Sequence, residues 1–180
     1  MYFGQFPIIE YDAVGAGDVK EVTHLLKRVA VHSKSKSVTA LYDTYDVKNG
    51  ETPEMIAHKY YGDAEYHWVI LLVNNITDRY HQWPMNTRQF LAHIDVRYDN
   101  VDATHHYEIS QASGDTNVKI DIGPSNIDVD GNTIASATLI TNREYEEAKQ
   151  DEIRKIRLLD PNYLEQFVDE FEGLISETED

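Results

Sequence analysis

The longest uninterrupted apolar run in the sequence, Trp68–Val73, constrains the fold more than any other segment. Apolar residues at the i, i+3, i+4 and i+7 positions predict a short helix that begins after Asp63 and ends at Asn74. The other positions of this helix are also apolar, so it must be buried on several sides, by its own domain or by a partner. The run is also far shorter than the roughly 20 residues of a membrane-spanning helix, so we expect no segment to cross a bilayer.

A strand, a turn and another helix precede this apolar segment. Residues 42–47 have the composition of a strand, and Gly50 supplies a turn position with positive φ. Thr52 is a typical N-cap, Pro53 suits the first position of the helix, and Gly62 suits its end. The sequence therefore predicts a strand, a turn and two consecutive short helices.

The patterns after this unit predict both helices and strands. We expect a helix over 86–94, strands over 106–109 and 118–122 around Gly114-Asp115, and a hairpin over 127–134 with Asp130-Gly131 at its tip. We then expect a charged helix opened by the capping box Thr141-x-x-Glu144, a short strand over 156–158, and a last helix begun by Asp160-Pro161, with a frayed tail over 177–180.

The N-terminal 40 residues differ in charge from the rest of the chain. They carry five basic and four acidic side chains, against six and fifteen in 41–140 and five and thirteen in 141–180. Asp18-x-x-Glu21 and the apolar residues that follow at helical spacing, up to Val29, predict a short helix. We interpret the basic stretch 27–36 as a solvated loop or as a contact for an acidic protein, rather than as a nucleic-acid or lipid site.

Composition excludes several classes of function. The chain has no cysteine, so it has no disulfide framework, thiolate metal site or cysteine nucleophile. Its net charge of −16 disfavours binding to a phosphate backbone. Residues 1–10 make a poor secretory signal, so we expect the chain to act where it is made or to leave in an assembly.

The residues that could carry chemistry form no convincing site. None of the eight histidines has the helical spacing of a zinc site, and we expect neither a metal nor a cofactor. Residues 126–131 match the start of a calcium-binding loop, but Ala137 stands where its bidentate glutamate belongs, so a hairpin is preferred. Without an activated nucleophile or phosphate loop, we do not expect an enzyme. We expect Trp68 to be a core residue, whereas Trp83 is equally suited to a ligand contact and to domain packing.

The central segment resembles a LysM module, in which a strand, two short helices and a second strand form a βααβ unit. Three blocks carry the resemblance: Tyr45–Ala57, Tyr60–Asp63 and Trp68–Asn75. Taken alone, it implies binding of peptidoglycan or chitin by an attachment or lysis protein, and this is our alternative function. However, the usual ending of the second strand is absent, because residues 79–84 lead into a helix instead.

The whole chain resembles the baseplate wedge protein fifty-three family of contractile-tailed bacteriophages, which carries a LysM-like fold. This resemblance implies a structural protein in the tail baseplate of the virion, assembled in the host cytoplasm, that joins neighbouring wedges and stabilises the baseplate ring. The implied partners are other wedge subunits, a sheath-initiator-like subunit and possibly copies in neighbouring wedges, with no nucleic acid, membrane or small-molecule substrate. The segments that carry the resemblance are Phe6–Tyr11, Leu25–Val29, Pro53–Ala57, Tyr61–Asp63, His67–Leu72, Asn75–Asp78, Asn142–Tyr145, Ile153–Leu159 and Phe167–Phe171.

These observations together predict an α+β fold with a LysM-like βααβ core, an N-terminal arm with a helix, a small β-hairpin insertion and C-terminal helices. The expected segments are an arm over 1–40, a LysM-like domain over 41–97, the insertion over 98–140 and a helical extension over 141–180. We expect aspartate at both Phe167 and Phe171 to abolish assembly while leaving the central fold intact. The predicted core residues are Val47, Gly50, Ile56, Ala57, Tyr60, Gly62, Trp68, Val69, Leu72, Val73 and Asn75. The candidates for a partner interface are Phe6, Ile8, Leu25, Trp83, Leu164, Phe167, Val168, Phe171 and Leu174.

Overall fold

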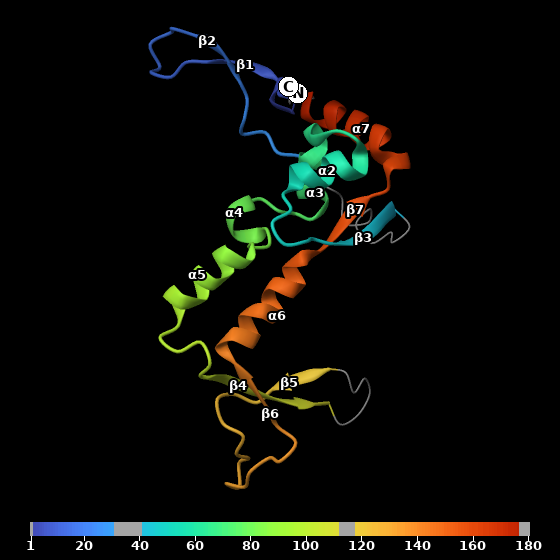
Figure 1. The fold of residues 1–180 in the computed structure, drawn as a ribbon. Coiled ribbons are helices and arrows are strands. Elements are labelled where there is room, and N and C mark those ends of the chain that lie inside the picture. Colours follow the sequence, from blue (N-terminus) through green and yellow to red (C-terminus); the bar gives the residue numbers. More distant parts are fainter. Residues whose placement is uncertain (1, 31–40, 112–117, 177–180) are drawn as a thin grey trace. The chain divides into compact units, whose positions relative to one another are not determined.

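The chain divides into two compact units in the computed structural model, which describes residues 2–30, 41–111 and 118–176. Helices and small antiparallel sheets occur in both units, which confirms the α+β class (Figure 1). Three features of the sequence lie wholly or partly outside the described residues: the basic stretch beyond Ala30, Gly114-Asp115, and the tail over 177–180. Unit 1 comprises Met1–Trp83 and Lys155–Asp180, and unit 2 comprises Pro84–Arg154.

Unit 1 brings together two strands that are far apart in the sequence. Strand β3 (Tyr42–Asp46) pairs with β7 (Lys155–Leu159) in an antiparallel ladder that runs from Tyr42↔Leu159 to Asp46↔Lys155. Both strands lie where the sequence predicts them, but the whole of unit 2 separates them along the chain. The LysM-like βααβ arrangement stays a prediction, as does the division into four segments. The helices of unit 1 between the two strands are α2 (Pro53–Tyr61), the 3-10 helix η3 (Ala64–Tyr66), α3 (His67–Val73) and α4 (Arg79–Gln82).

The predicted caps position the first two of these helices. The Thr52 hydroxyl accepts a hydrogen bond from Met55 N, and Pro53 occupies the first turn of α2. Helix α2 ends at Gly62, whose φ of 85° allows its N–H to reach the carbonyl of His58. Asp63 then accepts a hydrogen bond from Glu65 N at 2.9 Å and starts η3.

Helix α3 lies between two apolar clusters of unit 1, which explains why it is apolar on nearly all faces. Val69 belongs to the first cluster and Ile70 to the second. The first cluster contains the buried residues Phe6, Trp68, Val69, Val73, Leu159, Phe171 and Ile175. The second contains Val47, Ile56, Ala57, Ile70, Trp83, Ile156 and Leu158.

The helix predicted for residues 18–29 is wrong. Strand β1 (Ile8–Tyr11), which follows the 3-10 helix η1 (Tyr2–Gln5), pairs with β2 (Lys20–Thr23) in an antiparallel hairpin. The β-branched side chains around Val22 favour a strand, and local hydrogen bonding overrides the capping pattern. One Asp12 carboxylate accepts the N–H groups of four residues of the connecting turn, Val14 to Gly17, and both glycines there have positive φ.

This turn makes the hairpin sensitive to acid. The N–H groups of Gly17 and Val14, then those of Gly15 and Ala16, hold the pKa of Asp12 below its ordinary value of 3.8. A carboxylate whose pKa is lowered by folding stabilises the folded form at pH values above its ordinary pKa. This contribution is lost as the pH falls through the lowered pKa of the folded form. We expect the Gly15 and Gly17 amide resonances to shift together below pH 3.8. Titration of Asp12 at or above its ordinary pKa would contradict this, and Asp12→Asn should remove the transition.

The C-terminal part of unit 1 begins as predicted. Asp160 accepts a hydrogen bond from Asn162 N at 2.8 Å and starts the 3-10 helix η4 (Pro161–Tyr163). Helix α7 (Leu164–Ser176) follows and buries Phe171 and Ile175 against the first cluster. Part of the apolar stripe predicted for this helix is therefore buried within unit 1.

The described residues of unit 2 form two helices and a three-stranded antiparallel sheet. Asn86 and Gln89 form a capping box at the start of the helix predicted over 86–94. The predicted hairpin over 127–134 is reduced to a single bridge, Ile127↔Thr133, closed by a turn in which Gly131 has a φ of 85°. No helix within the described residues is long and apolar enough to cross a membrane. The elements are α5 (Thr87–Arg97), β4 (Thr104–Ser110), β5 (Lys119–Asp121), β6 (Thr138–Thr141) and α6 (Asn142–Arg154), with strand order β5-β4-β6.

Candidate functional site

The predicted LysM-like core residues fall into three groups in unit 1. Val47, Ile56, Ala57, Trp68, Val69 and Val73 are buried. Tyr60 and Leu72 are half-buried. Gly50, Gly62 and Asn75 are exposed and have positive φ, so they shape turns rather than fill the core.

The candidate interface residues also separate by accessibility. Phe6, Trp83 and Phe171 are buried within unit 1. Leu164, Phe167 and Val168 are half-buried and pack against the first cluster. Ile8, Leu25 and Leu174 remain exposed, and they are the members of the set that this chain leaves most open to a partner.

An apolar groove of about 510 Å³ lies along the accessible side of α7. Phe167 and Leu174 line it from the helix, and Leu72 and Tyr42 line it from other parts of unit 1. The Glu170 side chain adds an acidic group to the lining, which is more apolar than polar. The other lining residues are Val29, Ala30, Leu41, Leu159, Tyr163, Gln166 and Phe171.

Trp83 is used for packing inside unit 1. Its ring belongs to the second apolar cluster, and its indole N–H donates to the carbonyl of Glu51 at 2.9 Å. The Glu51 side chain itself accepts hydrogen bonds from Lys48 N and the Tyr45 hydroxyl. Burial alone would raise the pKa of Glu51, but these bonds outweigh burial and hold the pKa below its ordinary value. Of the two roles left open for Trp83, the structure shows domain packing.

Sequence reasoning missed Asn74, which ties α3 to β7. Its side-chain Nδ2 donates to the carbonyls of Ile70 and Arg157, both at 2.8 Å, and its Oδ1 accepts the N–H of Arg157 at 2.9 Å. Because β3 covers one edge of β7, the Asn74 amide acts as a substitute for a strand at the other edge. The neighbouring Asn75, a predicted core residue, is exposed and has a φ of 57°.

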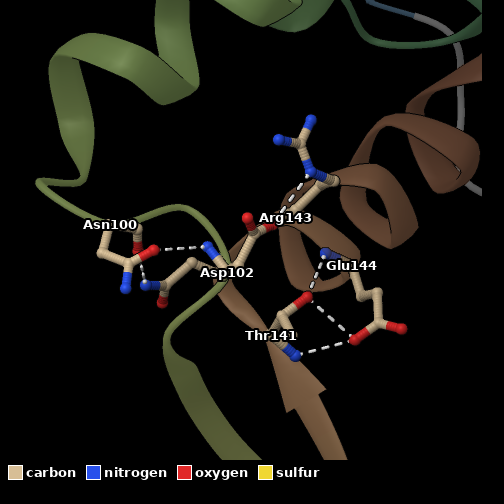
Figure 2. A network of polar contacts seen from close by, with 6 residues as sticks. Asn100, Asp102, Thr141, Arg143 and Glu144 are labelled. Carbon is tan, nitrogen blue, oxygen red and sulfur yellow. Dashed lines mark hydrogen bonds and ion pairs between the residues drawn. The ribbon is translucent and has the colours of Figure 1, made fainter.

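Unit 2 holds a polar network at the start of α6 (Figure 2). Thr141 and Glu144 form the predicted capping box, with a 2.8 Å bond from Thr141 N to Glu144 Oε2 and a 3.2 Å bond from Glu144 N to Thr141 Oγ1. The Asn100 side chain accepts the N–H of Asp102 at 3.0 Å, and Arg143 Nε lies 3.5 Å from an Asp102 carboxylate oxygen. These contacts hold the loop before β4 against the N-terminus of α6.

A second polar cluster of unit 2 surrounds Glu146, which is only 3% exposed. The Tyr98 hydroxyl donates to Glu146 Oε1 at 2.8 Å, and the Arg97 and Lys149 nitrogens lie 3.4 and 3.7 Å from the same oxygen. Two cations and a hydroxyl therefore compensate the buried charge. These contacts link the C-terminal end of α5 to α6.

The histidine pair of unit 2 is held by its neighbours. The two ring Nδ1 atoms of His105 and His106 lie 2.8 Å apart, and the His105 ring stacks on Tyr145. Burial, and then electrostatic interaction with the nearby His106 and Lys149 side chains, lower the pKa of His105. Among residues 2–30, 41–111 and 118–176, no three His, Cys, Asp or Glu side chains are placed to hold a metal ion.

Comparison with known proteins gives the family. A family model described as base plate wedge protein 53 matches residues 1–120, which is two-thirds of the chain, and no curated protein matches it. The matched class is that of structural proteins of the phage tail baseplate. The chain belongs to the base plate wedge protein 53 family. This confirms the resemblance seen in the sequence and places the protein in the tail baseplate of the virion, where it contacts other baseplate proteins.

Proposed function

We propose that this protein joins neighbouring wedges and thereby stabilises the baseplate ring through protein–protein contacts. Its partners in this proposal are other wedge subunits, a sheath-initiator-like subunit and copies in neighbouring wedges. The observation that carries the proposal is the apolar groove along α7, which the core of unit 1 leaves accessible. LysM-like packing of unit 1 around α3 is part of the same proposal.

The exposed apolar side chains around this groove favour a stable contact. Leu174 is 42% exposed, and Tyr163 at the start of the same helical segment is exposed to the same extent. Large apolar patches on a protein surface mark interaction sites, because covering them removes about 25 cal/mol of unfavourable hydration per Å². A permanent assembly commonly buries about 2,000 Å² or more, so this groove would form only part of the interface.

Charge indicates what kind of surface meets the groove. The helix that borders it, α7, carries Glu165, Asp169, Glu170 and Glu172 and no basic residue. The chain as a whole carries a net charge of −16. Complementary charge accelerates association and suppresses wrong partners, so we expect basic residues around the apolar surface of the partner.

Electron microscopy of lysates tests the proposal, using a phage with this gene disrupted and the intact gene supplied in parallel. We expect separate wedges and unclosed baseplates without assembled tails, and restoration by the intact gene. In the same assay, Leu174→Asp should reduce closed baseplates about tenfold or more, since 1.4 kcal/mol corresponds to a factor of ten. The matched control is Leu91→Asp, a similarly exposed helical leucine of unit 2, which should close normally.

A different outcome would favour the alternative function, which is binding to peptidoglycan of the host cell wall. Complete particles that fail only at the host surface would contradict the joining role, as would retention of the purified protein on insoluble peptidoglycan. We expect neither result, because the chain belongs to a family of phage baseplate proteins.

A further inference from the structure

The hairpin β1–β2 forms a separate two-stranded sheet with little cover of its own. All four residues of β2 are exposed, and only Ile9 of β1 is half-buried. Ile8 is 67% exposed, and Leu26 after the hairpin is 84% exposed. A two-stranded hairpin alone is marginally stable in water, so this one gains from any additional pairing.

The register of the hairpin shows which backbone groups face outward. The His24 N–H donates to the Pro7 carbonyl at 2.8 Å, so this pair is a hydrogen-bonded one. Because hydrogen-bonded and non-hydrogen-bonded pairs alternate, Ile8↔Thr23 and Glu10↔Glu21 are non-hydrogen-bonded pairs. The N–H and carbonyl groups of Ile8 and Glu10 therefore point away from β2, at an edge that no strand of the described residues covers.

The same register places two negative charges face to face. Glu10 lies directly opposite Glu21, and side chains approach most closely in non-hydrogen-bonded pairs. Like charges at opposed positions destabilise a hairpin. Lys20, the one lysine within the two strands, lies 3.8 Å from Asp18 instead. A cation from outside the hairpin would satisfy both glutamates.

We propose that the outer edge of β1 pairs with a β-strand of another baseplate protein, and that this strand places a lysine or arginine against Glu10 and Glu21. The inference rests on the proposed joining function and names the chemistry of one contact. Backbone hydrogen bonds to Ile8 and Glu10 supply the affinity, and the cation supplies the specificity. A second copy of this chain fits poorly, because it would bring more glutamates to the same edge and carries a net charge of −16 itself.

Charge reversal at Glu10 is expected to have opposite effects on the stability of the hairpin and on the binding of the partner strand. Glu10→Lys creates an attractive pair with Glu21, so amide exchange in the hairpin should slow. Binding of the basic strand should nevertheless weaken, and the yield of closed baseplates should fall about tenfold or more. Glu147→Lys, at an exposed position of α6, is the matched control and should give normal yield. An unchanged or increased yield with Glu10→Lys would overturn the proposal.

The backbone contact has its own test. Glu10→Pro removes an N–H that points outward and leaves the pairing with β2 intact, because proline is tolerated at edge strands. We expect the hairpin to persist, as judged by nuclear magnetic resonance, while the yield of closed baseplates falls as for Glu10→Lys. Normal assembly with Glu10→Pro would exclude strand pairing at this edge.

Photo-crosslinking identifies the occupant. A photoreactive residue at Ile8 of the full-length protein should link, in infected cells, to another baseplate protein at a segment that carries lysine or arginine. Replacing that cation with glutamate should restore assembly of the Glu10→Lys variant. A crosslink to a second copy or to an acidic segment, or none in closed baseplates that contain the protein, would overturn the hairpin proposal and leave the joining function standing. Closed baseplates after gene disruption would instead refute the joining function.

Discussion

Aspartate in place of Phe171 is expected to unfold unit 1 or to lower its free energy of unfolding by more than about 5 kcal/mol. Phe171 is only 4% exposed, and its ring centroid lies 4.3 Å from that of Trp68. Removing a buried phenylalanine side chain costs about 3–5 kcal/mol, and a carboxylate without a partner adds to this cost. Since small domains are stable by only about 5–15 kcal/mol, the loss approaches the whole of that stability. Urea denaturation followed by tryptophan fluorescence measures it.

This result would correct the expectation that aspartate at both Phe167 and Phe171 leaves the central fold intact. The double variant would lose assembly because unit 1 unfolds, and it would say nothing about an interface. The matched control is Leu174→Asp, one helical turn further along α7 and substantially exposed, which should change stability by no more than about 0.5–1 kcal/mol. Similar destabilisation by Leu174→Asp would show that the groove is not an accessible surface.

Alanine in place of Asn74 is expected to lower the free energy of unfolding by about 2–4 kcal/mol. The substitution removes three hydrogen bonds of the Asn74 side chain, each worth about 1 kcal/mol, two of them with the backbone of Arg157. Helix α3 and strand β7 would remain in contact through the apolar side chains of the two clusters. Hydrogen exchange should report the change locally as faster exchange of the Arg157 amide.

Two neighbouring variants test the assignment to Asn74. Asn74→Asp keeps an acceptor for Arg157 N but loses both donated bonds and places a carboxylate against two carbonyls, so it should be at least as destabilising as alanine. Asn75→Gly should be nearly neutral, because Asn75 is exposed and its φ of 57° suits glycine. If Asn75→Gly is the more harmful variant, the connection between α3 and β7 is not made by Asn74.

Local signals account for the elements that the sequence predicted well. Thr52, Asp63, Asn86, Thr141 and Asp160 all accept hydrogen bonds from backbone N–H groups at the start of helical segments, as their positions indicate. A cap acts within three or four residues of itself, so its effect can be read without knowledge of the fold. The same holds for the apolar spacing of α3 and α7.

The hairpin β1–β2 shows where local reading fails. Asp18 and Glu21 match a capping box, but a turn organised by Asp12 and a strand partner at Ile8–Tyr11 decide the conformation instead. Cross-strand pairing joins residues from separate segments of the sequence, so a pattern of neighbouring residues cannot predict it.

The amino-acid sequence by itself determined the capped starts of several helices, the buried character of α3, the absence of cysteine chemistry and the resemblance to the baseplate family. These properties depend on residues close together in the chain, or on composition. Only the tertiary structure decided that β3 pairs with β7, although unit 2 separates the two strands along the chain. It also decided that Asn74 rather than Asn75 ties α3 to β7, and that Phe171 is buried while Leu174 is accessible. The two side chains lie on the same apolar stripe of α7, and which of them is covered depends on contacts with Trp68 and the rest of unit 1.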